Sequence, residues 1–108
     1  MERNIHIHTL YWRGVTIEIA YEPVWLNQES RFFPPAHLEI RVVAPERAKL
    51  PITETGYRSH FIDPEDVNEL GGPLPYVRTW LDTAARDQAW RDHIEAARQY
   101  ALFAEGAF

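Results

Sequence analysis

The sequence predicts an α+β fold, in which a three- or four-stranded antiparallel β-meander is followed by two or three α-helices packed on one face of the sheet. Before residue 45, apolar and polar residues alternate in several stretches, which is the period of a half-buried strand. After residue 63, apolar residues recur at helical spacings. Strands first and helices after is the order of an α+β protein. The 108 residues form one domain, 1–108.

The first two strands are expected at residues 5–11 and 15–21, joined through Trp12-Arg13-Gly14. A three-residue loop with Gly14 in a left-handed bulge conformation would give both strands one shared apolar face. In this register, His8 lies opposite Glu18 on the other face. The predicted core face consists of Ile5, Ile7, Tyr11, Val15, Ile17, Ile19 and Tyr21.

A third strand and an unusual polar segment follow. In the third strand we expect Leu38, Ile40 and Val42 to point inward and His37, Glu39 and Arg41 to point outward. Residues 52–63 read ITETGYRSHFID, and the ITETGY part can add a short fourth strand. We interpret the whole segment as a connector that turns at Gly56 and is anchored on the core by Tyr57 and Phe61.

Three helices are expected in the second half of the chain. Asp63 is a good N-cap before Pro64, and Gly71-Gly72 stops this short helix. A second helix spans residues 73 or 74 to 86, and Asp87 can cap a third. The apolar side of the second consists of Val77, Trp80, Leu81 and Ala84, and that of the third of Trp90, Ile94, Ala97 and Ala101.

Composition excludes several classes of protein. The chain has no cysteine, which excludes disulfides, thiolate zinc sites and a cysteine nucleophile. It lacks an apolar run long enough to span a membrane, and its first residues do not resemble a signal peptide, so a cytoplasmic location is expected. The net charge is −5 with 11 scattered basic residues, which disfavours direct nucleic-acid binding. An acidic chain can instead engage a basic protein surface, including one that normally holds nucleic acid.

Two groups of residues are candidates for chemistry. His6 and His8 project from the same face of a strand and could chelate a metal with Glu18 and His37, but we favour a solvated outer face as their explanation. In the second group, Glu54, Arg58 and His60 could serve a small hydrolase. Ser59 and His60 are adjacent, however, and adjacent side chains in an extended segment point apart. We therefore assign no catalytic residue, cofactor or metal.

Residues 99–103, QYALF, resemble the Q-L-S/D-L-F pentapeptide with which bacterial replication and repair proteins bind the sliding clamp. Gln99, Leu102 and Phe103 match this pattern, whereas Tyr100 and Ala101 depart from it. Such peptides insert apolar side chains into a groove. The alternative is that Tyr100 and Phe103 continue the apolar side of the third helix.

Longer motifs carry a second resemblance. The stretches YWRGVTIEIAYEP, APERAKLPITETGYRSHF, GGPLPYV and RQYALF resemble a group of small uncharacterised proteins of alphaproteobacterial plasmids and other mobile elements, over most of residues 10–103. This resemblance implies an accessory gene of a plasmid, phage or integrated element. It implies neither an activity nor a binding residue.

The function expected from these observations is a non-catalytic module that binds a host protein. It would act as an inhibitor of a defence system, such as an anti-CRISPR or anti-restriction protein, or as a factor associated with the sliding clamp. The alternative functions are a small hydrolase or metal enzyme, and a protein that binds single-stranded nucleic acid through Arg58 and Arg78. The protein could also form a homodimer. The candidate protein-binding residues are Phe32, Phe33, Arg58, His60, Gln99, Leu102 and Phe103.

Overall fold

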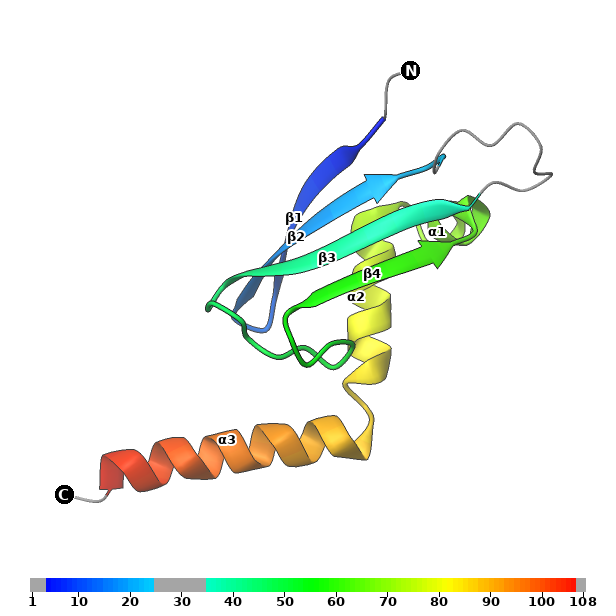
Figure 1. Ribbon diagram of the computed structural model, residues 1–108. Helices are drawn as coiled ribbons and strands as arrows, with labels where there is room; N and C mark the ends of the chain where they lie inside the picture. Colours follow the sequence, from blue (N-terminus) through cyan, green and yellow to red (C-terminus); the bar gives the residue numbers. More distant parts are fainter. Residues whose placement is uncertain (1–3, 25–34, 107–108) are drawn as a thin grey trace.

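A computed structural model describes residues 4–24 and 35–106, and within them it contains four strands followed by three helices (Figure 1). The strands are β1 (His6–Trp12), β2 (Val15–Glu22), β3 (Ala36–Ala44) and β4 (Tyr57–Ile62), and the helices are α1 (Pro64–Glu69), α2 (Pro73–Ala84) and α3 (Gln88–Gly106). The sheet order is β1-β2-β3-β4, and each neighbouring pair is antiparallel. The predicted α+β meander is confirmed.

The turn between β1 and β2 is shorter than the sequence analysis predicted. Trp12 pairs with Val15, so the loop has only Arg13 and Gly14, at φ 46° and 81°. Two successive left-handed residues give a turn whose twist matches that of the strands. Arg13 adopts this conformation although it is not glycine, and its guanidinium lies 4.7 Å from the Trp12 ring centre.

This turn reverses the predicted faces of β1, because a shift of one residue sends every side chain to the other side of the sheet. Leu10 and Trp12 are buried, with 1% and 4% of their surface exposed. Ile5, Ile7 and Tyr11, which were predicted to be core residues, are exposed. The predictions for the inward faces of β2 and β3 are confirmed for Ile17, Ile19, Tyr21, Leu38, Ile40 and Val42.

Helices α1 and α2 cover one face of the sheet, which we call the inner face (Figure 1). Asp63 caps α1 as predicted, since its Oδ1 accepts a hydrogen bond of 2.9 Å from the backbone N–H of Glu65. Val77 and Leu81 of α2 are fully buried, and Trp80 and Ala84 pack beside them. The Trp12 Nε1 donates a 2.9 Å hydrogen bond to Asp82, which ties β1 to α2.

Helix α3 does not cover the sheet. Its first turn is held by Trp90, whose ring centre lies 6.1 Å from that of Trp12. The helix then projects away from the body (Figure 1), and Ile94 and Tyr100 are exposed. The chain consequently extends over 63 × 25 × 20 Å. Of the three expected helices, two pack on the sheet. In the part of the chain that the structure describes, no helix is long and apolar enough to cross a membrane.

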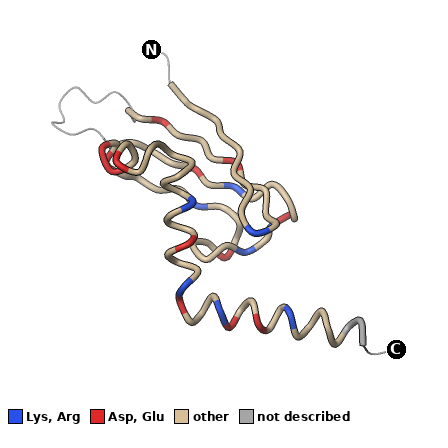
Figure 2. Tube along the Cα trace, turned by 180° about the vertical axis from the view of Figure 1, so that it is seen from behind, with Lys and Arg blue, Asp and Glu red and all other residues tan. Residues whose placement is uncertain are grey.

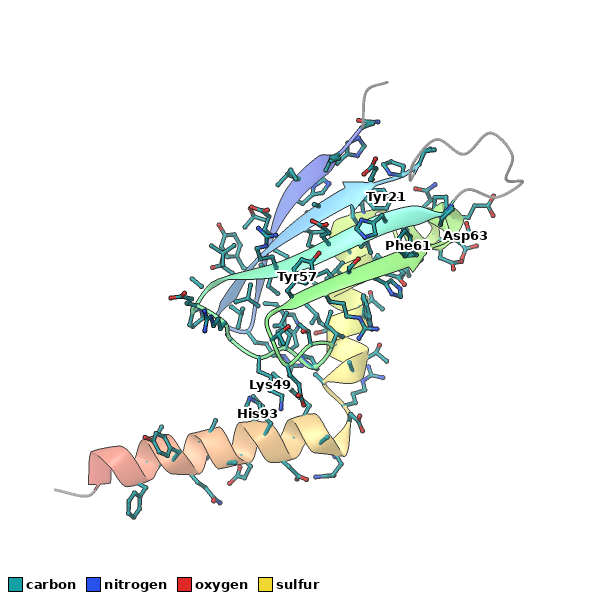
Figure 3. The ribbon with its side chains drawn as sticks, viewed as in Figure 1. Tyr21, Lys49, Tyr57, Phe61, Asp63 and His93 are labelled. Carbon is teal, nitrogen blue, oxygen red and sulfur yellow. The ribbon has the colours of Figure 1, made fainter. Side chains whose placement is uncertain are left out.

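The segment 52–63 is not the connector that we predicted. Its second half is strand β4, and the preceding residues form a turn with an isolated bridge between Leu50 and Thr53. Gly56 does turn the chain, at φ 81°. Tyr57 and Phe61, predicted to anchor the segment on the core, instead point to the side of the sheet opposite α2 (Figure 3). The cause is the start of the strand at Tyr57, which fixes the alternation of its side chains.

Candidate functional site

The face of the sheet opposite α2, which we call the outer face, carries large apolar side chains that no described helix covers (Figure 3). Ile7 and Tyr11 of β1 are 58% and 73% exposed, and Tyr57 and Phe61 of β4 are 42% and 52% exposed. Antiparallel sheets commonly solvate one face, but with polar side chains. Exposed apolar groups on both edge strands of a face that no described helix covers indicate an interaction surface.

Charged residues lie between these two apolar borders. Glu18 of β2 is paired in register with Arg41 of β3, and Glu39 of β3 with Ser59 of β4. The Arg41 guanidinium lies 5.7 Å from the Tyr57 ring centre, so one cation is held against the aromatic border. Charges of both signs are spread along the rest of the chain, and no basic stripe forms in the described residues (Figure 2). The centre of the outer face thus has two half-buried carboxylates, Glu18 and Glu39, and one exposed cation, Arg41.

The outer face also holds a serine–histidine pair that the sequence analysis missed. His37 Nε2 and Ser59 Oγ lie 2.7 Å apart, and Phe61 lies beside the imidazole with its ring centre at 4.8 Å. His37 is 6% exposed, and Glu22, its partner in register, is 4% exposed. The two residues of the pair are 22 positions apart, so only the strand register could have revealed it.

This pair has the distance of a nucleophile and its base. The adjacent cavity, lined by Ile5, Ala20, Glu22, His37 and Glu39, has a volume of about 30 Å³. That volume accommodates about one water molecule beside His37, and Ser59 is not part of the lining. The bond is explained by the need of a buried imidazole for a polar partner.

Arg58 and His60 point toward the inner face, because they alternate with Tyr57, Ser59 and Phe61 along β4. Arg58 donates a 2.9 Å hydrogen bond to the carbonyl of Ile52, and its guanidinium lies 5.1 Å from the Trp80 ring centre. The His60 ring centre is 4.6 Å from that of Trp80. Burial, followed by the charges of Arg58 and His37, lowers the pKa of His60. Arg58 therefore joins β4 to a loop and to α2, and His60 joins β4 to α2.

The predicted chemical sites are not assembled. His6 and His8 lie opposite Tyr21 and Ile19, on the inner face, whereas Glu18 and His37 are on the outer face. The four candidate metal ligands are therefore not brought together, because the one-residue shift that reversed β1 moved the two histidines to the inner face. Among residues 4–24 and 35–106, no three His, Asp or Glu side chains are grouped as metal ligands.

The three hydrolase candidates are also separated. Glu54 forms an ion pair with Lys49 at 3.8 Å, whereas Arg58 and His60 contact Trp80. The prediction that Ser59 and His60 point apart is confirmed.

The clamp-like residues lie within α3. Leu102 and Phe103 are 61% and 76% exposed, and Gln99 donates a 3.2 Å hydrogen bond to Glu95 one turn earlier. At 100° per residue, Phe103 falls well away from the Trp90 and Ile94 side of the helix. Our alternative interpretation, in which Phe103 continues the apolar side of the helix, is therefore wrong. Phe32 and Phe33 lie outside the described residues.

A groove of about 320 Å³ opens where α3 leaves the body. Its apolar lining includes Leu50, Ile52 and Trp90, and Lys49 and Asp87 contribute charged groups. The Trp90 Nε1 is buried without a hydrogen-bond partner. The groove is therefore a mixed apolar and polar concavity at the base of the projecting helix.

Comparison with known proteins gives one assignment. No curated protein and no solved structure matches the chain significantly. A family model described as KlcB third domain matches residues 5–90, which include the whole sheet, α1, α2 and the first turn of α3. Residues 91–106 of α3 lie outside this match. The chain therefore belongs to the KlcB third domain family.

Proposed function

We propose that this domain is a non-catalytic interaction module of a mobile genetic element, which binds a host protein through the outer face of its sheet. The observation that carries the proposal is the pair of exposed apolar borders formed by Ile7 and Tyr11 on β1 and by Tyr57 and Phe61 on β4. Large, partly exposed aromatic side chains are the residues that dominate protein interfaces. The family match agrees with the mobile-element context that the sequence motifs imply.

The charges between the borders define the class of partner. Glu18 and Glu39 occupy the centre of the face, and Arg41 is held against Tyr57. A partner with basic groups flanked by apolar pockets complements this arrangement. Host nucleases and other defence effectors have such surfaces where they hold nucleic acid. An anti-CRISPR or anti-restriction inhibitor that covers such a surface is the specific form of the proposal.

Affinity capture from a host lysate with matched variants tests the proposal. Tyr57→Ala removes a 42% exposed tyrosine from the outer face, and Tyr100→Ala removes a more exposed tyrosine, at 76%, from α3. The partner should be captured by the wild type and by Tyr100→Ala, and lost with Tyr57→Ala. With the purified partner, Tyr57→Ala should weaken binding about tenfold or more. Equal capture by both variants would place the interface elsewhere and refute the proposal.

The identity of the partner is tested separately. Binding to a basic surface should slow as salt rises, because electrostatic steering is screened. The purified partner should also lose its nucleic acid in competition with this domain. Association independent of salt, or simultaneous binding of nucleic acid, would contradict the proposal that a nucleic-acid surface is covered.

A sliding clamp is the second candidate partner, favoured by the exposure of Leu102 and Phe103 on α3. An extended pentapeptide can enter a clamp groove only after the last turns of α3 unwind. Purified clamp should bind the wild type and Tyr57→Ala but not a variant with Leu102→Ala and Phe103→Ala. Absence of binding by the wild type would refute this candidate.

The serine–histidine pair provides a test of the non-catalytic part of the proposal. A fluorophosphonate probe labels serines that are activated by a base. We expect Ser59 to remain unlabelled, because its contact with His37 is explained by the need of a buried imidazole for a polar partner. Stoichiometric labelling that is lost in both Ser59→Ala and His37→Gln would assign the protein to the hydrolases instead.

A further inference from the structure

The two edge strands of the sheet, β1 and β4, differ in whether their outward-pointing backbone N–H and C=O groups are hydrogen-bonded. In a two-residue hairpin the residues that flank the turn form a hydrogen-bonded pair, so Trp12 bonds to Val15. By alternation, Ile7, Thr9 and Tyr11 direct their N–H and C=O groups away from β2. No hydrogen bond to another described residue satisfies these outward groups.

The backbone N–H and C=O groups of β4 also alternate between pointing toward and away from the sheet, but some of the outward groups are hydrogen-bonded. Val42 donates a 2.8 Å hydrogen bond to the carbonyl of Gly56, so Tyr57 is in the outward-pointing set. Its carbonyl accepts hydrogen bonds of 2.8 Å from Thr53 Oγ1 and 3.2 Å from Thr55 Oγ1. Its N–H contacts Thr55 Oγ1 at 3.4 Å. Two threonine hydroxyls thus cap part of this edge, whereas no described residue caps the edge of β1 in this way.

Strand β1 also lacks the usual devices that keep a border strand from pairing. Its sequence HIHTLYW contains no Lys, Arg, Asp, Glu, Pro or Gly over 7 residues. Natural proteins protect exposed border strands with charges, prolines or bulges. An uncharged strand with free backbone groups and exposed Ile7 and Tyr11 is a template for another strand.

We infer that β1 pairs with β1 of a second copy, in an antiparallel arrangement about a two-fold axis at Thr9. This register places Thr9 opposite Thr9 and Ile7 opposite Tyr11 of the other copy, and all three residues carry outward backbone groups. Threonine pairs and pairs of aromatic and β-branched residues are favourable cross-strand neighbours. The interface forms about six backbone hydrogen bonds, two for each pair.

The occupant is a second copy because this strand is complementary to itself. A closed two-fold interface uses the same residues on both sides. Here it brings together no charged side chains, although the chain has a net charge of −5. The two four-stranded sheets become one, and the outer faces of the two copies become continuous. This inference does not depend on the proposed function.

Sedimentation equilibrium over about 1 μM to about 1 mM tests the dimer. We expect a reversible monomer–dimer equilibrium. Thr9→Lys, which brings two like charges together at the axis, should raise the dissociation constant about tenfold or more. Thr79→Lys places the same charge on an exposed position of α2 and should leave the equilibrium unchanged. Circular dichroism shows whether each variant is folded.

Amide hydrogen exchange locates the interface without any variant. The amides of Ile7, Thr9 and Tyr11 should become protected as the concentration rises. A monomer at all concentrations, open-ended aggregation, or a dimer in which these amides exchange as fast as in the monomer would overturn the inference. A dimer that persists equally in Thr9→Lys would do so as well. Loss of host-protein binding in Tyr57→Ala does not bear on this result, so the two proposals fail independently.

Discussion

Because of the register of the β1–β2 hairpin, replacing Leu10 and replacing its neighbour Tyr11 should have very different effects on the free energy of unfolding. Leu10 is 1% exposed on the inner face, and Tyr11 is 73% exposed on the outer face. Replacement of a buried leucine by alanine removes apolar burial and leaves a cavity, which together cost about 3 kcal/mol. A single exposed aromatic residue contributes little to folding, so Tyr11→Ala should cost about 0.5 kcal/mol or less.

Urea unfolding followed by tryptophan fluorescence measures both variants. Trp12, Trp80 and Trp90 lie between the sheet and the helices and report loss of this packing. With a denaturant dependence of about 1.5 kcal/mol/M, Leu10→Ala should lower the midpoint by about 2 M and Tyr11→Ala by about 0.3 M or less. Dilute protein keeps the proposed dimer dissociated during the measurement.

The opposite ranking would refute the structure of the hairpin. If Tyr11→Ala were the more destabilising change, the three-residue loop with a glycine bulge would be correct and Ile7 would also be a core residue. The outer face would then lose half of its apolar border. The same pair of variants therefore tests the foundation of the proposed interface before any partner is known.

Two further predictions concern the second turn and the inner face. Gly14 and Gly56 share φ of 81°, but a Cβ at Gly14 meets nothing within 4 Å, whereas one at Gly56 lies 3.3 Å from the Ala48 carbonyl oxygen. In urea unfolding, Gly14→Ala should lower the free energy of unfolding by about 1 kcal/mol, from the left-handed conformation alone, and Gly56→Ala should lower it by about 2–3 kcal/mol. Equal costs for the two variants would contradict the crowding at Gly56. Because the pKa of His60 is lowered on folding from 6.5, the unfolded chain binds more protons below pH 6.5, so stability should fall as the pH drops from about 7.5 to about 5.5. The fall should be smaller in His60→Gln, and an unchanged pH dependence would show that His60 is not responsible.

The sequence predicted those elements whose local signals agree with their packing. Asp63-Pro64 specifies the start of α1 through a side-chain cap and a fixed φ, both of which are local properties. The buried face of α2, including Val77 and Leu81, follows from an apolar period of 3.6 residues, which fits a helix and not a strand. The inward residues of β3 alternate without ambiguity. These features need no knowledge of distant residues.

The register of β1 could not be predicted in the same way, because both of its faces are apolar. Ile5, Ile7 and Tyr11 alternate with Leu10 and Trp12, and either set could form a core. The choice depends on the conformation of Arg13 and on the hydrogen bond from Trp12 to Asp82, 70 residues away. The candidate interface was missed for the same reason, since its apolar residues were assigned to the interior.

The three surfaces of this domain are physically separable, and this property decides how its function can be found. Tyr57 and Phe61 lie on one border of the outer face, Thr9 on the opposite edge of the sheet, and Phe103 on the far part of α3. All four are exposed and lie outside the buried core. The family match ends at residue 90, where Trp90 makes the contact of α3 with Trp12, so residues 91–106 lie beyond the matched fold. Changes at Tyr57, Thr9 and Phe103 should therefore each alter one interaction while the fold and the other two interactions remain intact, whereas Ile7 and Tyr11 belong to both the outer face and the β1 edge.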